Sequence, residues 1–142
     1  MILTLLNIAD YLPALGILDR SHIYCGKMPD KKEKCICVYN LSGSREKRET
    51  IGGDQNSSYR VKPVSLLVHW DKSSERTEIA ADKLYEAVGN IKNADMEGKR
   101  VLFARLLTDS PVDVGTDEND IYEMVIEAEF YYERKERKEN EV

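Results

Sequence analysis

The stretch "IYEMVIEAEFYYER", residues 121–134, decides the fold class because its side chains alternate between apolar and acidic. Successive side chains of a β-strand point to opposite faces of the sheet, so a period of two predicts a strand here. One face of this strand is expected to pack inward and the other to face solvent. The inward set is Tyr122, Met124, Ile126, Ala128, Phe130 and Tyr132, and the outward set is Glu123, Glu127, Glu129 and Glu133.

Other segments also have the composition of strands. "YRVKPVSLLVHW", residues 59–70, is rich in strand-forming residues, and "KRVLFARLL", residues 99–107, is a further strand candidate. Pro63 cannot donate a backbone hydrogen bond, which predicts an edge position or a bulge at that point. Residues 23–27 and 34–40 are predicted to be short strands, joined as a hairpin through the charged, proline-containing "MPDKKEK".

Two segments show helical periodicity instead. Apolar spacing predicts a first helix over residues 3–12, which ends before Pro13. A second helix is predicted from Glu75 to Val88, with Ser74 as its N-cap. Its buried stripe is expected to comprise Thr77, Ala80, Ala81, Leu84, Val88 and Ile91. Together the elements predict an α+β domain, a mostly antiparallel sheet of about four to five strands with two main helices packed on it.

The length of 142 residues suits a single domain, which we expect to span residues 1–134. The polar stretch "LSGSREKRETIGGDQNSS", residues 41–58, has no apolar periodicity and predicts a long loop that is either disordered by itself or functional when bound to a partner. Residues 135–142 alternate in charge without apolar content, which predicts a flexible tail.

Composition and charge exclude several classes of protein. With 42% hydrophobic and 33% charged residues, the chain is neither a disordered tract nor a membrane protein. Its net charge of -5 opposes general binding to nucleic-acid phosphates. The apolar N-terminal segment lacks a basic leader and is broken by Pro13, so neither a signal peptide nor a membrane span is predicted. Without export, the cysteines are expected to be reduced thiols.

Carboxylates are dense in "DSPVDVGTDENDIYE", residues 109–123, which raises the question of a metal site. A calcium loop of the EF-hand kind that began at Asp113 would need glycine and glutamate where the chain has Glu118 and Met124. That match fails. The favoured interpretation is a turn whose side chains bond to their own backbone, and a looser oxygen cage is the alternative.

His22, Cys25, Cys35 and Cys37 form the other cluster of potential ligands. Cys35 and Cys37 would share one face of a strand, which is compatible with tetrahedral zinc, but paired C-x2-C motifs are missing. Buried reduced cysteines are the favoured interpretation. His69, within "LLVHW", is expected to be a partly buried strand residue rather than a general base. We therefore assign no catalytic, cofactor-binding or metal-ligating residue.

Two polar segments are candidate interaction surfaces. The basic run in the long loop could contact phosphate or an acidic partner, although the glutamates within it weaken its positive charge. A solvated loop without a partner is the favoured interpretation. The loop candidates are Arg45, Lys47, Arg48, Asp54 and Gln55, and the turn candidates are Asp113, Asp117, Glu118 and Asp120.

Two longer segments carry a family resemblance. "SSYRVKPVSLLVHWDKSSERTEIAADKLYEAV", residues 57–88, and "PVDVGTDENDIYEMVIEAEFYYER", residues 111–134, resemble minor capsid proteins encoded between the head and tail genes of tailed bacteriophages and prophages of Gram-positive bacteria. Such proteins look like tail terminators, which are small α+β subunits that form a ring, expected to be a hexamer. The ring caps the tail tube and gives the head its docking surface. The resemblance brings no active-site motif.

The resemblance implies a structural virion protein and not an enzyme. Its expected location is the head–tail junction of the virion, and the host cytoplasm during assembly. The implied partners are further copies of the chain, the tail tube protein and head-connector proteins. DNA would pass through the channel without specific binding, and no membrane is involved. The alternatives are a head-completion (connector) protein, a metal- or thiol-dependent enzyme that uses His22 and the cysteines, and a nucleic-acid-binding accessory protein.

Overall fold

The computed structural model describes residues 2–28, 34–41 and 58–134. Two α-helices and two short 3-10 helices lie among the strands in this part of the chain. The helices are α1 Leu5–Tyr11, η1 Leu12–Leu15, η2 Arg20–His22 and α2 Ser74–Gly89. The strands are β1 Ile23–Cys25, β2 Cys35–Asn40, β3 Tyr59–His69, β4 Lys92–Met96, β5 Lys99–Leu106, β6 Val112–Thr116 and β7 Tyr122–Glu133.

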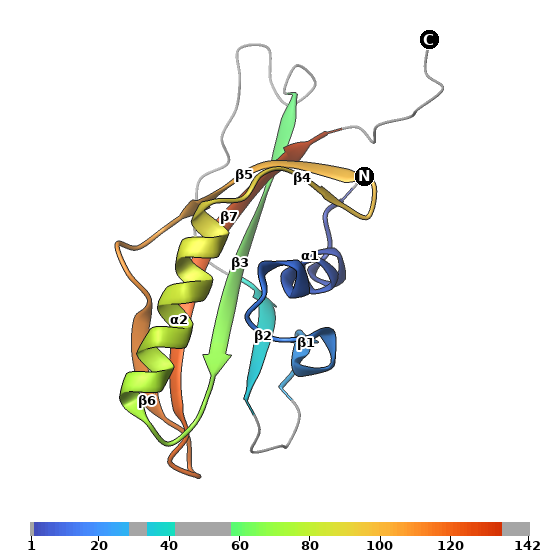
Figure 1. Ribbon diagram of the computed structural model, residues 1–142. Helices are drawn as coiled ribbons and strands as arrows, with labels where there is room; N and C mark the ends of the chain where they lie inside the picture. Colours follow the sequence, from blue (N-terminus) through green and yellow to red (C-terminus); the bar gives the residue numbers. More distant parts are fainter. Residues whose placement is uncertain (1, 29–33, 42–57, 135–142) are drawn as a thin grey trace.

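The predicted α+β class is confirmed, but the sheet is larger and more mixed than expected. Within the described residues it has seven strands in the order β1-β2-β3-β7-β5-β4, and β6 pairs with β7, whereas the sequence predicted about four to five strands. Figure 1 shows both α-helices on the same side of this curled sheet. Their apolar faces meet the inner face of the sheet in one continuous core.

The centre of the sheet is the long antiparallel pair of β3 and β7, in register from Tyr59 opposite Glu133 to His69 opposite Glu123. The alternation predicted for β7 is confirmed on its inner face, where every second residue from Met124 to Tyr132 is buried. The outer face is less simple. Glu129 is only 2% exposed, and it accepts hydrogen bonds from the side chains of Tyr131 and Arg105. Tyr131 on the same strand and Arg105 on β5 therefore bond to a buried carboxylate that the pattern alone placed in water.

Pro63 lies in a central strand, so the predicted edge position is wrong. The carbonyl of Pro63 accepts a hydrogen bond from the Leu41 amide, which places the proline nitrogen on the β2 side of β3. Regular pairing with β2 ends one residue away, where Asn40 lies opposite Val64. The missing N–H thus falls just beyond the end of β2, where one lost hydrogen bond does not interrupt the pairing of β3 with β7.

The predicted hairpin between the first two strands is also wrong. β1 and β2 pair in parallel, with Ile23 opposite Ile36 and Cys25 opposite Val38. Gly26 ends β1 with a positive φ of 68°, and its amide donates to the Val38 carbonyl. A hairpin joins antiparallel strands, so the parallel pairing of β1 with β2 excludes one.

The two helices begin one or two residues away from their predicted starts. Thr4 and Asn7 form a reciprocal capping box that starts α1 at Leu5. In α2 the cap is Ser73 rather than Ser74, because the Ser73 hydroxyl accepts the hydrogen bond from the Arg76 amide. The predicted buried stripe from Thr77 to Ile91 is confirmed.

The strands β4 and β6 were not predicted from the sequence. β4, "KNADM", is short and largely polar, with a positive φ at Asn93 within it and at Glu97 just after it, and only Ala94 and Met96 give it a buried face. The sheet curls here toward α1, where the Lys99 amino group donates to the Asn7 side chain at 3.0 Å. β6 lies within the carboxylate-rich stretch predicted to be only a turn, and all of its residues are exposed.

Candidate functional site

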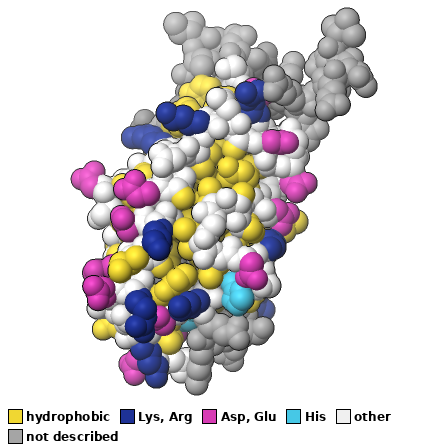
Figure 2. All heavy atoms as spheres, viewed as in Figure 1, with side chains coloured by type: hydrophobic (Ala, Val, Ile, Leu, Met, Phe, Trp, Pro, Cys, Tyr) yellow, Lys and Arg dark blue, Asp and Glu magenta, His cyan; other side chains and the backbone are white. Residues whose placement is uncertain are grey.

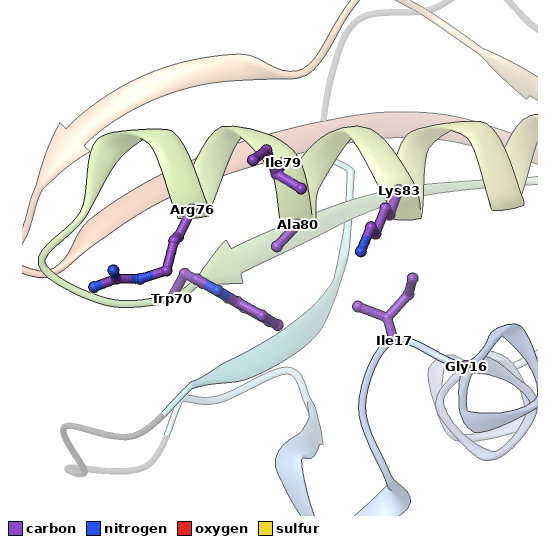
Figure 3. A pocket seen from close by; sticks show the side chains of 7 residues that line it. All are labelled: Gly16, Ile17, Trp70, Arg76, Ile79, Ala80 and Lys83. Carbon is purple, nitrogen blue, oxygen red and sulfur yellow. The ribbon is translucent and has the colours of Figure 1, made fainter.

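A shallow groove of about 250 Å³ runs beside α2. Figure 3 shows that Trp70, at the end of β3, and Ile17, after η1, extend toward the space between them. The Lys83 side chain reaches down from α2 toward Ile17, and Arg76 points outward near the start of the helix. The groove, called the α2 groove below, is lined by Gly16, Ile17, Trp70, Arg76, Ile79, Ala80 and Lys83.

Positive charges border the apolar floor of the α2 groove. Lys34 lies 5.0 Å from the centre of the Trp70 ring, within the range of a cation–π contact. Arg76 is held by Asp71, with 2.8 Å between Nε and Oδ2. Burial raises the pKa of Asp71, but the hydrogen bonds from Arg76 and from the Ser73 amide outweigh it and leave the pKa below its usual value. Figure 2 shows Lys and Arg side chains, with Asp and Glu side chains among them, beside hydrophobic ones over the lower part of α2.

The floor of the groove includes an apolar side chain on the solvent side of the helix. Ile79 is 49% exposed and does not belong to the buried stripe of α2. Sequence reasoning did not single out this groove. The sequence did contain one indication of the groove, which is an isoleucine on the charged face of the predicted amphipathic helix. Such a residue indicates either a contact surface or a chance exposure.

β6 presents a second exposed surface, at the edge of the sheet. It pairs with β7 from Val112 to Thr116, and no other strand of the described chain pairs with it. Val112 is 42% exposed and Val114 is 50% exposed. The surface called the β6 edge below consists of Val112–Thr116 and the following turn, residues 117–120.

The acidic residues predicted as an interaction turn fall into two groups. Asp113 accepts a hydrogen bond from the Gly115 amide, and Asp117 accepts two, from the amides of Asn119 and Ile121. These two carboxylates bond to their own backbone, as the turn interpretation expects. Glu118 and Asp120 are exposed at the tip of the turn, where they carry negative charge next to the valines of β6.

Metal and phosphate sites gain no support from the part of the chain that the structure describes. In residues 2–28, 34–41 and 58–134, no three His, Cys, Asp or Glu side chains converge as a metal site would require. The predicted loop residues Arg45, Lys47, Arg48, Asp54 and Gln55 lie outside the described residues.

The predicted ligand set of His22 and the cysteines is divided between the two faces of the sheet. Cys35 and Cys37 share the outer face, with sulfur atoms 3.9 Å apart. Cys25 lies opposite Val38 on the other face and packs against the core. His22 is instead hydrogen-bonded to Asp19, and this bond lowers the pKa of the Asp19 carboxyl. All three thiols are free, as expected.

The structure reveals a polar row that the sequence did not, across three neighbouring strands. Cys35 of β2 lies opposite His69, and His69 lies opposite Glu123. The histidine Nδ1 is 3.0 Å from Glu123 Oε2 and 3.8 Å from Asp117 Oδ2, while His69 is 1% exposed. His69 is therefore fully buried, not partly buried as predicted, and its Nε2 has no hydrogen-bond partner among the described residues.

The row of Cys35, His69 and Glu123 contains the residue types of a catalytic nucleophile, base and orienting acid, but it lacks the access that catalysis needs. The hydrogen bond with Cys37 lowers the pKa of Cys35, whereas the same contact and burial raise the pKa of Cys37. However, Cys35 is 3% exposed and Cys37 is 0% exposed, so a substrate could not reach either sulfur without opening of the sheet. The contact that the structure shows is a polar link between β3 and β7.

Comparison with known protein families agrees with a protein that acts through its exposed surfaces. The family model described as "Bacteriophage tail terminator protein" matches residues 11–134. This chain belongs to the bacteriophage tail terminator family. The match covers α2, all of the strands and both surfaces defined above. No curated protein matches the chain.

Tail terminators are structural proteins of the phage particle, which agrees with the predicted class of a phage structural protein. Among the helices in the described residues, none is long and apolar enough to cross a membrane. The α2 groove and the β6 edge are therefore the candidate functional sites, and both are suited to contacts between proteins.

Proposed function

We propose that this terminator caps the tail tube of its phage as a ring of identical subunits, expected to be a hexamer, and gives the head-connector proteins their docking surface. It would act in the host cytoplasm during assembly and remain in the virion at the head–tail junction. In this role the chain works through surface complementarity, without catalysis or a cofactor.

The observation that carries the proposal is the family match over residues 11–134. The surfaces of the subunit support it. A ring subunit needs contact surfaces on more than one side, because each copy meets two neighbours. The exposed β6 strand and the groove beside α2 are two such surfaces on one domain.

The charge of the chain is also compatible with a DNA passage. With a net charge of -5, a ring of these subunits would not hold phosphates through a general positive field. DNA could then slide through the channel rather than bind to it. A ring whose channel is lined by Arg and Lys would contradict this part of the proposal.

The test is a binding and length assay with tail tubes. Purified protein is added to growing tail tubes of the same phage, and tube length and the tube ends are measured by electron microscopy. A ring at one end of each tube and an arrest of growth are expected. Binding to the portal assembly in place of the tube would favour the head-completion role. Binding to neither would refute both.

A further inference from the structure

We infer that the α2 groove receives the β6 edge of a second copy of this chain. The inference rests on the proposed function, because it names the contact by which neighbouring ring subunits would recognise each other. It commits to one occupant, a copy of the same chain, for which the structure offers both complementary surfaces.

The first argument is chemical. The groove has an apolar floor with Trp70 and the half-exposed Ile79, and a positive rim with Arg76 and Lys83. The β6 edge has the reverse pattern of charge. Two half-exposed valines, Val112 and Val114, lie beside acidic residues. The acidic residues are Asp113, Asp117, Glu118 and Asp120. Apolar side chains would meet at the centre, and opposite charges would meet around them, which is the usual anatomy of a specific interface.

The second argument is topological. Figure 1 shows β6 on the opposite side of α2 from α1, whereas the groove lies on the side of α2 that faces Ile17. A subunit could therefore offer its β6 edge to one neighbour while its own groove receives the edge of another. Such a contact joins different surfaces head to tail, and it generates a ring when the rotation closes.

The third argument concerns the orientation of the groove residues before binding. The carboxylate of Asp71 holds Arg76 at 2.8 Å, and Lys34 lies over the ring of Trp70. These contacts hold Arg76 and Lys34 beside the aromatic floor. A rim that is already ordered loses less side-chain freedom on binding than free lysine and arginine side chains would.

The test uses two variants that reverse the surfaces separately. The groove variant carries Ile79→Glu and Lys83→Glu, and the edge variant carries Val114→Lys and Glu118→Lys. All four side chains are exposed, so both variants are expected to fold, which circular dichroism and melting curves would verify. Lys92→Glu, at an exposed position on β4, makes the same change of charge as Lys83→Glu outside both surfaces and is the control.

Each variant alone places like charges in every contact between neighbours. Its self-association should weaken at least about tenfold, because like charges across an interface cost several kcal/mol and 1.4 kcal/mol is tenfold. An equimolar mixture makes every contact complementary again, since wild-type edges meet wild-type grooves and lysine edges meet glutamate grooves. The mixture should regain assembly, measured by native mass spectrometry and by rings on tail tubes, and the Lys92→Glu control should behave like wild type.

The outcomes separate this inference from the proposed function. If either variant alone assembles on tubes as well as wild type, or if the mixture does not regain assembly, the groove–edge contact is wrong while the capping role stands. If wild type forms rings neither in solution nor on tubes, the capping role and the contact are both refuted.

Discussion

The buried link between His69 and Glu123 predicts an unequal response to the loss of its two partners. Glu123→Leu removes the carboxylate that lies 3.0 Å from the histidine Nδ1. His69 is 1% exposed, so water cannot replace the lost partner. A buried donor left without an acceptor costs about 1–3 kcal/mol. Asp117, whose Oδ2 is 3.8 Å from the same nitrogen, could approach it and bring the cost toward the lower end of that range.

Replacing the histidine should lower the free energy of unfolding by less than replacing the glutamate does. His69→Phe keeps an aromatic ring in the sheet and leaves the carboxylate of Glu123, whose side chain is 16% exposed, able to reach water. The double variant removes both polar partners at once, so no buried group is left unpaired. Replacing both partners with apolar groups of similar shape is often nearly neutral.

The assay is urea unfolding of the wild type, the two single variants and the double variant at one pH. Glu123→Leu alone should lose more stability than the double variant does, which is a coupling between the two sites. If the losses of the two single variants simply add up in the double variant, the link makes no coupled contribution and the reasoning is refuted. Tail capping by the folded His69→Phe variant should equal that of wild type, because no catalytic role is assigned to the ring.

Three further predictions concern the turn, the thiols and the groove. Asp117→Ala removes the acceptor of two backbone amides, so the melting temperature should fall by an amount that corresponds to about 1–2 kcal/mol; Asp117→Asn, which keeps an oxygen, should fall less. Cys35→Ser should fold, and metal analysis of wild type should find less than one zinc per chain; stoichiometric zinc that Cys35→Ser loses would contradict the buried-thiol interpretation. The pKa of Asp71 is lower in the folded state than its unfolded value of 3.8, so the stability that its ionised form contributes is present above that value and is lost as the pH falls through the folded pKa. Arg76→Gln removes the hydrogen bond that lowers this pKa, so the loss of stability on the acid side should become smaller. Unfolding measured between pH 5 and pH 2, roughly the range over which a shifted Asp titrates, tests this.

Sequence periodicity was sufficient to predict a helix or strand where one face of the element is buried and the other faces solvent. This condition holds for the inner face of β7 and for α2, and both were predicted with nearly correct boundaries. The condition fails for β6, and in β4 only two residues, Ala94 and Met96, form the buried face. The apolar content of β4 is too small to predict a strand from sequence, and every residue of β6 is exposed, so no buried face marks β6 as a strand.

The errors in pairing and in the candidate sites share a physical cause, which is that cross-strand partners are distant in sequence. The parallel pairing of β1 with β2 depends on the path of the chain and not on local turn composition. The row of Cys35, His69 and Glu123 is created by the registers of three strands. No spacing in the sequence encodes that row. The α2 groove joins Trp70 to a helix and to the segment after η1 for the same reason.

The acidic residues of the β6 edge have a second role, which is to prevent this exposed edge strand from pairing with other chains. A strand that pairs with β7 on one side only and carries half-exposed valines is a template for non-specific pairing with other chains. Charged side chains suppress such pairing, and Asp113, Glu118 and Asp120 place like charges on every copy, so two β6 edges repel each other. A partner with a positive rim removes this repulsion, which the α2 groove with Arg76 and Lys83 would do. The same carboxylates would then oppose edge-to-edge aggregation and favour the head-to-tail contact that closes a ring.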